Sequence, residues 1–531
     1  MGDLAAGLTV GAMLVPQAMA YAQLAGLPPE VGLYSATIPL VLYALFGTSR
    51  QLAVGPVAIV SLLTAAALAP VAEIGTEEYL VAASVLAVMV GVVHLVLGLG
   101  RLGCIVKLLS HPVLVGFTGA AALIIGMSQL SHLFGITGAP RDSPDRTAMF
   151  VIEHLGQTNP ATLAIGLGSL ICLVGLKRLA PRVPAALVVV AGSISAFELG
   201  DLGGRGVAVI GEVPASLPTF AIPAIDGSIV GSLVGTAVVI TLIGVMESTA
   251  VATTVGRRHG HTLDPNRELI GLGAANLGAG LFGGYPVTGG LSRTAVNDQA
   301  GARSQLASIV TAAVVLTTIG LFTPLFASLP NAALAAIILS AVAGLIDLDE
   351  ARRIVRSDPG DALALGTAVI AVLAAGVERG VLIAMVVAWL VHLVRVLSRP
   401  ESRPGRILTE IFPYIRVRPA EQPTGKAQPV TLTNHPVDQY ETQLTQDAQF
   451  VDVREPDEVA GGALAGTANI PLTQLAQRID ELDPTRRVLL LCQSGGRSAK
   501  ASDFLVGMGF SDVVNLEGGM SQLDKSRAAR R

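Results

Sequence analysis

Two long apolar runs of this sequence are each interrupted at a proline. The interruptions are Gly55-Pro56-Val57-Ala58 and Gly284-Tyr285-Pro286-Val287-Thr288. Proline cannot donate a backbone hydrogen bond, and backbone polar groups freed inside a membrane must face protein or a water-filled cavity. A half-helix starting after each break would present bare N–H groups and a positive dipole end. Two such helices facing one another would attract an anion, whereas the simpler alternative is a pair of ordinary kinked helices.

Polar side chains near the breaks extend this prediction. Gln17 offers an amide donor, Ser292 offers a hydroxyl, and Arg293 is a cation close to the second break. Thr288 and Thr294 are further candidates on the same argument. Helix–helix hydrogen bonding is the structural alternative for Gln17 and Ser292, and an ion pair that supports the fold is the alternative for Arg293.

An isolated carboxylate, Glu247, directly follows the apolar run 238–246. An ionisable residue in a membrane-spanning segment is by default a functional hypothesis. Glu247 could therefore take up and release a proton as a transport site alternates between the two sides of a membrane. The structural alternative is a salt bridge, for which Arg293 is the candidate partner.

Near the C-terminus, a buried-strand pattern at 487–491 leads directly into Cys492-Gln493-Ser494-Gly495-Gly496-Arg497-Ser498. The glycines and the residues after them predict a loop that opens a helix. A thiol at a helix start is acidified by the nearby N–H groups and by the helix dipole, so Cys492 is a candidate nucleophile. A second strand pattern, at 450–455, precedes it.

The elements that must position these residues are predicted from composition and apolar runs. The 531 residues are 51% hydrophobic and only 14% charged, which is typical of a polytopic membrane protein. Fourteen apolar segments are predicted to span the membrane, the third and tenth being short half-helices. They lie near 4–20, 31–47, 56–70, 80–98, 109–128, 161–177, 183–199, 228–250, 268–283, 291–302, 306–328, 332–346, 361–376 and 380–397.

Charge distribution gives this topology an orientation. Basic residues gather after the even-numbered segments, at Arg50, Arg101, Lys107, Lys177, Arg178, Arg182, Arg257, Arg258, Arg267, Arg303, Arg352, Arg353, Arg356 and Arg399. The opposite loops are mainly acidic and carry only the scattered Arg141, Arg146, Arg205 and Arg379. The positive-inside rule then places both termini in the cytoplasm, and seven plus seven segments admit an inverted repeat.

Three regions follow from these patterns. Residues 1–398 form the membrane domain, 399–439 form a proline-bearing linker, and 440–531 form a compact cytoplasmic domain. The three cysteines, Cys104, Cys172 and Cys492, are too few and too scattered for a disulfide framework. This favours a bacterial inner membrane with the soluble parts in a reducing cytosol.

The first 400 residues resemble the SulP family of anion transporters. The resemblance is carried by Gly7–Gly11, Val15–Ala22, Leu27–Tyr34, Gly47–Arg50, Gly55–Ala58 and Gly289–Asn297. It implies an all-α fold of fourteen spans with core and gate domains, an elevator-like motion and a homodimer.

Carried over residue by residue, the resemblance implies an anion site with members on the first, third and tenth spans. These are Gln17, Tyr21, the backbone of Val57 and Ala58, Leu291, Ser292 and Arg293. In the family, a glutamate at the position of Glu247 accompanies proton coupling, whereas a sodium-using branch has an aspartate with hydroxyl partners. Here the residue four positions later is Val251, so we expect proton coupling.

The C-terminal region resembles a single-domain rhodanese. Asp452–Pro456, Asn469–Pro471, Cys492–Arg497 and Leu516–Gly519 match that family in order. The resemblance implies that Cys492 carries a persulfide, that Arg497 attracts the anionic donor, and that Asp452 and Arg454 support the site. Departures at Gly462–Gly466 and Leu523 leave open a binding or regulatory role without catalysis.

These expectations give three functional classes. The first is proton-coupled uptake of sulfate or a related oxyanion, with the rhodanese domain transferring or sensing sulfane sulfur. The second is an exchanger or uniporter for chloride, bicarbonate or a dicarboxylate, and the third is a membrane-tethered sulfurtransferase. The eight histidines show no metal spacing, and the letters GxGxxG at 98–103 follow a membrane segment, so we expect no metal, no cofactor and no nucleic acid.

Overall fold

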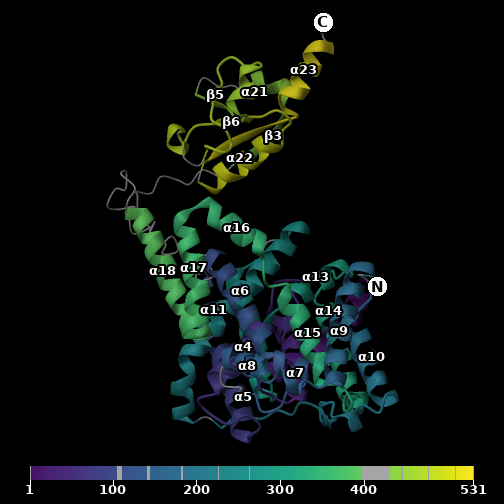
Figure 1. The fold of residues 1–531 in the computed structure, drawn as a ribbon. Coiled ribbons are helices and arrows are strands. Elements are labelled where there is room, and N and C mark those ends of the chain that lie inside the picture. The colour runs from purple at the N-terminus through teal and green to yellow at the C-terminus, as the bar shows by residue number, and fades with distance from the viewer. Residues whose placement is uncertain are drawn as a thin grey trace. The chain divides into compact units, whose positions relative to one another are not determined.

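A computed structural model describes residues 2–103, 111–139, 144–180, 183–224, 226–261, 263–397, 431–443, 447–475, 478–508 and 510–529. The chain divides into two compact units, Met1–Arg416 and Val417–Arg531. In Figure 1 the first unit runs from purple to green and the second is yellow-green to yellow. The predictions made for Cys104, Lys107, Arg141, Arg182, Arg399 and most of the linker lie outside the described residues.

The first unit is built of helices. In chain order they are α1 (Gly2–Leu24), α2 (Pro29–Tyr34), α3 (Ile38–Phe46), α4 (Ala58–Leu68), α5 (Glu77–Leu99), α6 (His111–Ser128), α7 (Leu130–Phe134), α8 (Pro144–Glu153), α9 (Pro160–Leu179), α10 (Ala185–Leu199), α11 (Gly227–Arg258), α12 (Pro265–Leu281), α13 (Leu291–Gln299), α14 (Leu306–Leu321), α15 (Asn331–Ala343), α16 (Leu348–Ser357), α17 (Pro359–Ala375) and α18 (Val377–Leu397). Short 3₁₀ turns lie at Leu155–Gln157, Gly203–Arg205 and Thr323–Phe326.

Each of the fourteen segments predicted to span the membrane overlaps at least one of these helices, which in several cases is shorter than the predicted segment. Among the described residues, seven helical segments are long and apolar enough to cross a bilayer, so the number of crossings stays a prediction. The predicted segment 31–47 is divided into α2 and α3, because Pro39 in the first turn of α3 cannot continue a helix from the preceding residues. The short helices α7, α8 and α16 were not predicted.

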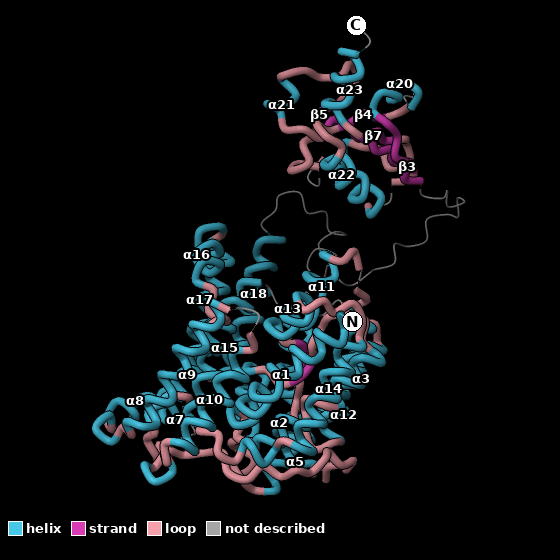
Figure 2. The backbone as a smooth tube through the Cα atoms, turned by 90° about the vertical axis from the view of Figure 1, so that its right-hand side faces the viewer, coloured by secondary structure: helices cyan, strands magenta, loops and turns pink. Residues whose placement is uncertain are grey.

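The two proline breaks meet inside the first unit. Val54–Gly55 forms strand β1 and Thr288–Gly289 forms strand β2, and the two pair antiparallel with Val54 opposite Gly289 and Gly55 opposite Thr288. Figure 2 shows this short ladder in magenta, surrounded by helices. As expected of half-helices, α4 has only 11 residues and α13 only 9, and each begins just after its break.

Small residues let the helices around the ladder pack closely. A Cβ on Gly280 of α12 would lie 2.5 Å from the backbone oxygen of Ser84 on α5, and one on Gly91 of α5 would lie 2.7 Å from the backbone nitrogen of Leu277. A Cβ on Gly271 would lie 2.6 Å from the Cα of Gly47. The absence of side chains at these glycines therefore lets the helices approach one another closely.

The second unit contains a parallel sheet with the strand order β3-β7-β6-β4-β5. Its elements are β3 (Thr431–Pro436), a 3₁₀ turn (Val437–Gln439), α20 (Tyr440–Gln443), β4 (Gln449–Asp452), α21 (Pro456–Ala460), β5 (Ala468–Asn469), a 3₁₀ turn (Ile479–Glu481), β6 (Val488–Leu491), α22 (Gly496–Gly507), β7 (Asp512–Glu517) and α23 (Gly519–Ala529). Strand β6 is buried on both faces, which agrees with its continuous apolar sequence.

Strand β3 corrects the predicted domain boundary. It lies inside the range 399–439 that we expected to be linker, and it pairs along its whole length with β7, from Thr431 opposite Asp512 to Pro436 opposite Glu517. The sheet therefore begins before residue 440. The strand was not predicted because its sequence is polar. An edge strand pairs with one neighbour only and needs little apolar surface, so it can lack the usual apolar pattern.

We predict that Gly280→Ala lowers the thermal stability of the detergent-solubilised protein. The new methyl group would overlap the backbone of α5, and overpacking of this kind costs about 1–3 kcal/mol. Gly175→Ala in α9 is the matched control, because nothing lies within 4 Å of its Cβ position. Equal melting temperatures for the two variants would contradict the close α5–α12 packing.

Candidate functional sites

The two breaks are fastened to one another by backbone and side-chain hydrogen bonds. The N–H of Gly290 donates to the carbonyl of Ala53 at 3.0 Å, and the N–H of Ala53 donates to the hydroxyl of Thr294 at 3.1 Å. The Asn297 amide donates to the carbonyl of Gln51 at 2.8 Å. Helix α13 is thereby held against the chain that leads into α4.

We call the place where β1 and β2 pair, together with the starts of α4 and α13, the crossing. Arg293 lies at its centre and is only 2% exposed. Its Nη1 donates to the carbonyl of Pro56 at 2.5 Å, which bridges the two breaks. Its Nε and Nη2 are buried without a hydrogen-bond partner among the described residues. A Cβ on Gly290 would lie 2.9 Å from the guanidinium, so a larger residue here would displace the Arg293 side chain. Two donors of a buried cation are left available for an anion.

The starts of α4 and α13 add positive potential to the same place. Neither the residue before α4, Val57, nor the residue before α13, Gly290, supplies a side-chain cap. The first N–H groups of a helix have no partner within the helix, and the dipole makes that end positive. An anion at the crossing would satisfy groups that the fold leaves free.

Glu247 is positioned by its neighbour on α11. The Ser248 hydroxyl accepts a hydrogen bond from the N–H of Gly289 at 2.9 Å and shares a hydrogen bond with the Thr288 hydroxyl at 2.8 Å. Thr288 also donates to the carbonyl of Gly244 at 2.9 Å. These contacts fix α11 against β2 at the level of the carboxylate.

The carboxylate itself forms no ion pair with another described residue. Oε2 of Glu247 is buried without a hydrogen-bond partner among the described residues. The salt bridge to Arg293, which was the structural alternative for both residues, is not formed between these two described side chains, although each lies within electrostatic reach of the other. The crossing thus contains an unpaired acid and a partly unpaired cation.

The other predicted residues fall into two groups. Gln17, Tyr21, Val57 and Ala58 are buried, and Oε1 of Gln17 has no described partner. The Tyr21 hydroxyl lies within electrostatic reach of Arg293 and Glu247. By contrast, the side chains of Leu291 and Ser292 at the start of α13 are exposed, and their contact with an anion stays a prediction.

Three polar residues of the crossing were missed from the sequence. The Asn276 side chain on α12 accepts from the N–H of Val287 at 2.9 Å and donates to its carbonyl at 3.0 Å. The side chain thus forms the two hydrogen bonds that a neighbouring strand would otherwise form with Val287. The Tyr285 hydroxyl shares a hydrogen bond with Ser61 of α4 at 2.9 Å. Ser248 is the third. In the sequence, each of these residues is only a polar side chain within or next to an apolar segment. Such residues are also typical of ordinary helix–helix packing, so the sequence did not single them out.

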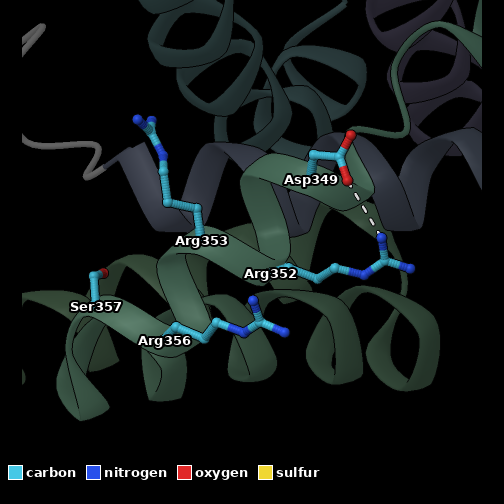
Figure 3. A pocket seen from close by; sticks show the side chains of 5 residues that line it. All are labelled: Asp349, Arg352, Arg353, Arg356 and Ser357. Carbon is cyan, nitrogen blue, oxygen red and sulfur yellow. Dashed lines mark hydrogen bonds and ion pairs between the residues drawn. The ribbon is translucent and has the colours of Figure 1, made fainter.

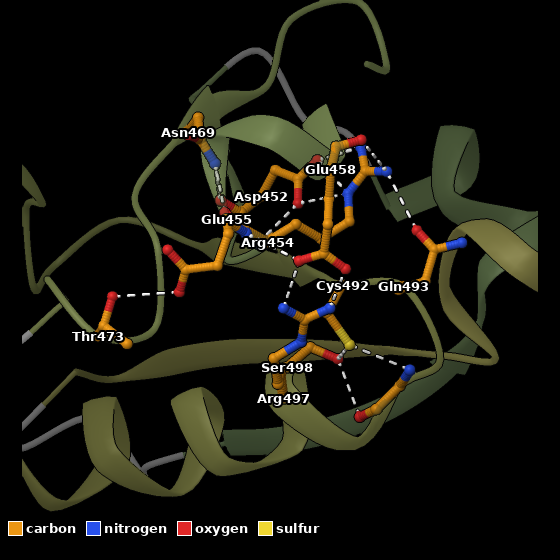
Figure 4. Close-up of polar contacts among 11 residues, drawn as sticks. Asp452, Arg454, Glu455, Glu458, Asn469, Thr473, Cys492, Gln493, Arg497 and Ser498 are labelled. Carbon is orange, nitrogen blue, oxygen red and sulfur yellow. Dashed lines mark hydrogen bonds and ion pairs between the residues drawn. The ribbon is translucent and has the colours of Figure 1, made fainter. Parts of the chain in front are cut away.

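In the second unit, Cys492 follows β6 directly and its side chain is buried (Figure 4). Its Sγ accepts from the N–H of Gly495 at 3.0 Å and lies 3.4 Å from the Ser498 hydroxyl. Burial raises the pKa of the thiol, but hydrogen bonds from Ser498, Ser494 and Gly495 outweigh burial and hold the pKa below its usual value. This environment stabilises a thiolate at the start of α22.

Arg497 is engaged in an ion pair. Its Nη1 and Nη2 donate to the two carboxylate oxygens of Glu458, both at 2.6 Å. These bonds, with a further one from the Glu455 backbone, lower the pKa of Glu458 to about 2. Attraction of an anionic donor by Arg497 stays a prediction, and it would require the guanidinium to share its charge with Glu458.

Asp452 and Arg454 form a buried ion pair beside the loop, with Nη2 and Oδ2 2.7 Å apart. Arg454 also donates to the carbonyl of Gly462 at 2.8 Å and to the side chain of Gln493 at 3.2 Å. Figure 4 shows this chain of contacts from β4 to the cysteine loop. The pair therefore positions the loop and does not touch the sulfur. No cluster of three or more metal-ligating side chains occurs in the part of the chain that the structure describes.

Comparison with known families agrees with both units. The model of the sulfate permease family matches residues 1–368. The chain belongs to the sulfate permease family. The model of the rhodanese-like domain matches residues 436–526, so this member of the family carries a C-terminal rhodanese-like domain.

Several curated relatives are similar to the membrane unit of this family member. Sulfate transporter 4.1, chloroplastic, from Arabidopsis thaliana is 37% identical over 388 residues, which are 72% of this chain and 56% of that protein. The probable sulfate transporter Rv1739c from Mycobacterium tuberculosis is 36% identical over 401 residues, which are 76% of this chain and 71% of that protein. The chain thus spans little more than half the length of the Arabidopsis relative.

Solved structures show the same fold. The structure of SLC26A9 matches 97% of this chain and 84% of its own with a TM-score of 0.70 and 23% identity. The transmembrane domain of the cyanobacterial bicarbonate transporter BicA matches 73% of this chain and 96% of its own with a TM-score of 0.63 and 24% identity. Our prediction of a SulP-like membrane domain fused to a rhodanese-like domain is confirmed.

We predict that Ser498→Ala slows alkylation of Cys492 at neutral pH. Loss of the hydroxyl raises the pKa of the thiol, so the thiolate forms at higher pH and the rate at pH 7 falls by about threefold to tenfold. The pH profile is measured on the full chain by mass spectrometry of the Cys492 peptide. Ser502→Ala is the control, because that buried hydroxyl donates to the carbonyl of Ser498 and not to the sulfur. Identical profiles would contradict the assigned role of Ser498.

Proposed function

We propose that this chain takes up sulfate or a related oxyanion together with protons. The observation that carries the proposal is the crossing of β1 and β2, where two donors of Arg293 have no partner among the described residues and lie beside two uncapped helix starts. These groups suit an anion with several acceptor oxygens. Membership of the sulfate permease family and relatives named as sulfate transporters support sulfate as the substrate.

Proton coupling follows from charge at the crossing. An ionised Glu247 would repel an incoming anion and would offset the charge of Arg293. Protonation of the carboxylate removes this repulsion, so an anion and a proton would favour each other's binding. A divalent anion gains more from this linkage than a monovalent one, which favours an oxyanion such as sulfate.

Transport is proposed to occur by an elevator-like movement. Hydrogen bonds from α4, α11, α12 and α13 tie the crossing into one assembly, through Ser61, Ser248, Asn276 and Arg293. Such a site is suited to move as a rigid body, with the anion carried past a stationary gate domain. A homodimer in a bacterial inner membrane, with both termini cytoplasmic, remains part of the proposal.

The rhodanese-like domain is proposed to handle sulfane sulfur. The Cys492 thiolate attacks the outer sulfur of thiosulfate, a new S–S bond forms, and sulfite leaves with the electron pair of the broken S–S bond. The enzyme then holds a persulfide anion, and the total charge is unchanged. The loop N–H groups that stabilise the thiolate would also stabilise this product.

We predict that Glu247→Gln abolishes the proton-driven part of sulfate uptake. Labelled sulfate uptake into proteoliposomes under an inward proton gradient should fall to the level measured without a gradient, because glutamine cannot carry a proton across. The control Glu153→Gln makes the same change at an exposed position on α8 and should retain uptake. Cys492→Ser should retain uptake while losing sulfur transfer.

Three results would redirect this assignment. Full gradient-driven uptake in Glu247→Gln would exclude that carboxylate as the proton carrier. Wild-type protein that exchanges chloride or bicarbonate but takes up no sulfate would favour the exchanger. Sulfur transfer without transport of any tested anion would favour the membrane-tethered sulfurtransferase.

A further inference from the structure

Helix α16 lies between α15 and α17, at the end of the first unit where α17 begins and α18 ends (Figures 1 and 2). Its ten residues span about 15 Å, which is too short to cross a bilayer. The Asp347 side chain caps it by accepting from the N–H of Glu350 at 2.8 Å. Because α15 and α17 are apolar and α16 carries the charged residues between them, we expect α16 at the edge of the hydrocarbon region.

One face of α16 is fixed against the protein. Ile354 is only 6% exposed, and Glu350 contacts both His111 of α6 at 2.9 Å and Arg353 at 2.6 Å. Burial of Ile354 and the contact of Glu350 with α6 set the rotation of the helix about its own axis. The residues on its other face are therefore held in a defined direction.

The outward face combines apolar and basic side chains. Leu348 and Val355 are 59% and 55% exposed, and their spacing of seven residues places them on one side of the helix. Arg352 and Arg356 are spaced by four residues, so they lie on one side of the helix, next to the side that carries Leu348 and Val355. Exposed apolar residues bordered by arginines are typical of a helix at a membrane surface.

The two arginines are poorly neutralised by the protein. Arg352 pairs at 3.2 Å with Asp349, whose side chain is 95% exposed. The side chain of Arg356 has no ion pair or hydrogen bond within the described ranges. Figure 3 shows Arg352 and Arg356 extending to the same side, while Arg353 extends away from them. The three arginines, Asp349 and Ser357 border a shallow depression that is wide open to the surroundings.

We propose that α16 binds the headgroups of anionic phospholipids. Leu348 and Val355 contact the acyl chains, and Arg352 and Arg356 contact the phosphates. A lipid fits both halves of this surface, whereas a free oxyanion would leave the two apolar side chains in water. The surface is distinct from the crossing of β1 and β2, and the positive-inside rule assigns it to the cytoplasmic leaflet.

Lipid binding to the purified full chain tests this proposal. Native mass spectrometry in a neutral detergent compares retention of phosphatidylglycerol with that of phosphatidylcholine. We expect the wild type to prefer phosphatidylglycerol, and Arg352→Gln with Arg356→Gln to weaken its binding by about tenfold to thirtyfold. Arg352→Lys with Arg356→Lys keeps both charges and should retain most of the affinity, which separates lost charge from misfolding.

A matched variant tests whether the site is local. Lys177→Gln with Arg178→Gln removes two exposed charges from the last turn of α9, on the side also predicted to be cytoplasmic, and should leave the affinity within about twofold of the wild type. Equal losses in the two glutamine variants would show diffuse attraction to the leaflet and overturn the proposal. Equal retention of the two lipids would also overturn it, as would displacement of phosphatidylglycerol by an equal concentration of free sulfate.

Discussion

The first unit depends on how two interrupted backbones satisfy their polar groups inside an apolar assembly. Pairing of β1 with β2 solves part of this problem, and Nη1 of Arg293 solves another part by donating to the carbonyl of Pro56. Ser248 and Asn276 supply hydrogen bonds that a longer strand would have supplied itself. Among the described residues, the same solution leaves two guanidinium donors without a partner and two helix starts without a side-chain cap, so the constraint that holds the fold together also provides the groups of the proposed anion site.

The two units place positive potential at a reactive point in different ways. At the crossing, the Arg293 guanidinium lies beside the starts of α4 and α13 and within electrostatic reach of Glu247, whose Oε2 has no partner among the described residues. In the rhodanese-like domain, the strong cation Arg497 is bound to Glu458, and the sulfur of Cys492 is instead surrounded by backbone N–H groups and the Ser498 hydroxyl. The first arrangement suits an anion that arrives and leaves, and the second stabilises a negative charge that stays on the chain.

Much of this could be predicted because proline and charge leave local signals. Pro56 and Pro286 marked the two breaks, and the apolar strand before Cys492 marked the sulfur loop. The contacts of Ser248 with β2 could not be predicted, since they join segments about forty residues apart through tertiary register. Strand β3 was missed because its stability comes from pairing with β7 and not from its own polar sequence. The ion pair between Arg497 and Glu458 could not be predicted either, because it joins two residues that only the tertiary fold brings together.

The most direct test of the central claim is to locate a bound substrate analogue. Selenate resembles sulfate and scatters anomalously, so a crystal of the full chain soaked with selenate would show where the anion lies. Our account predicts a peak between the starts of α4 and α13, within hydrogen-bonding distance of Nε or Nη2 of Arg293, that disappears in Arg293→Gln. A fully occupied peak elsewhere in the first unit, with none at the crossing, would contradict it.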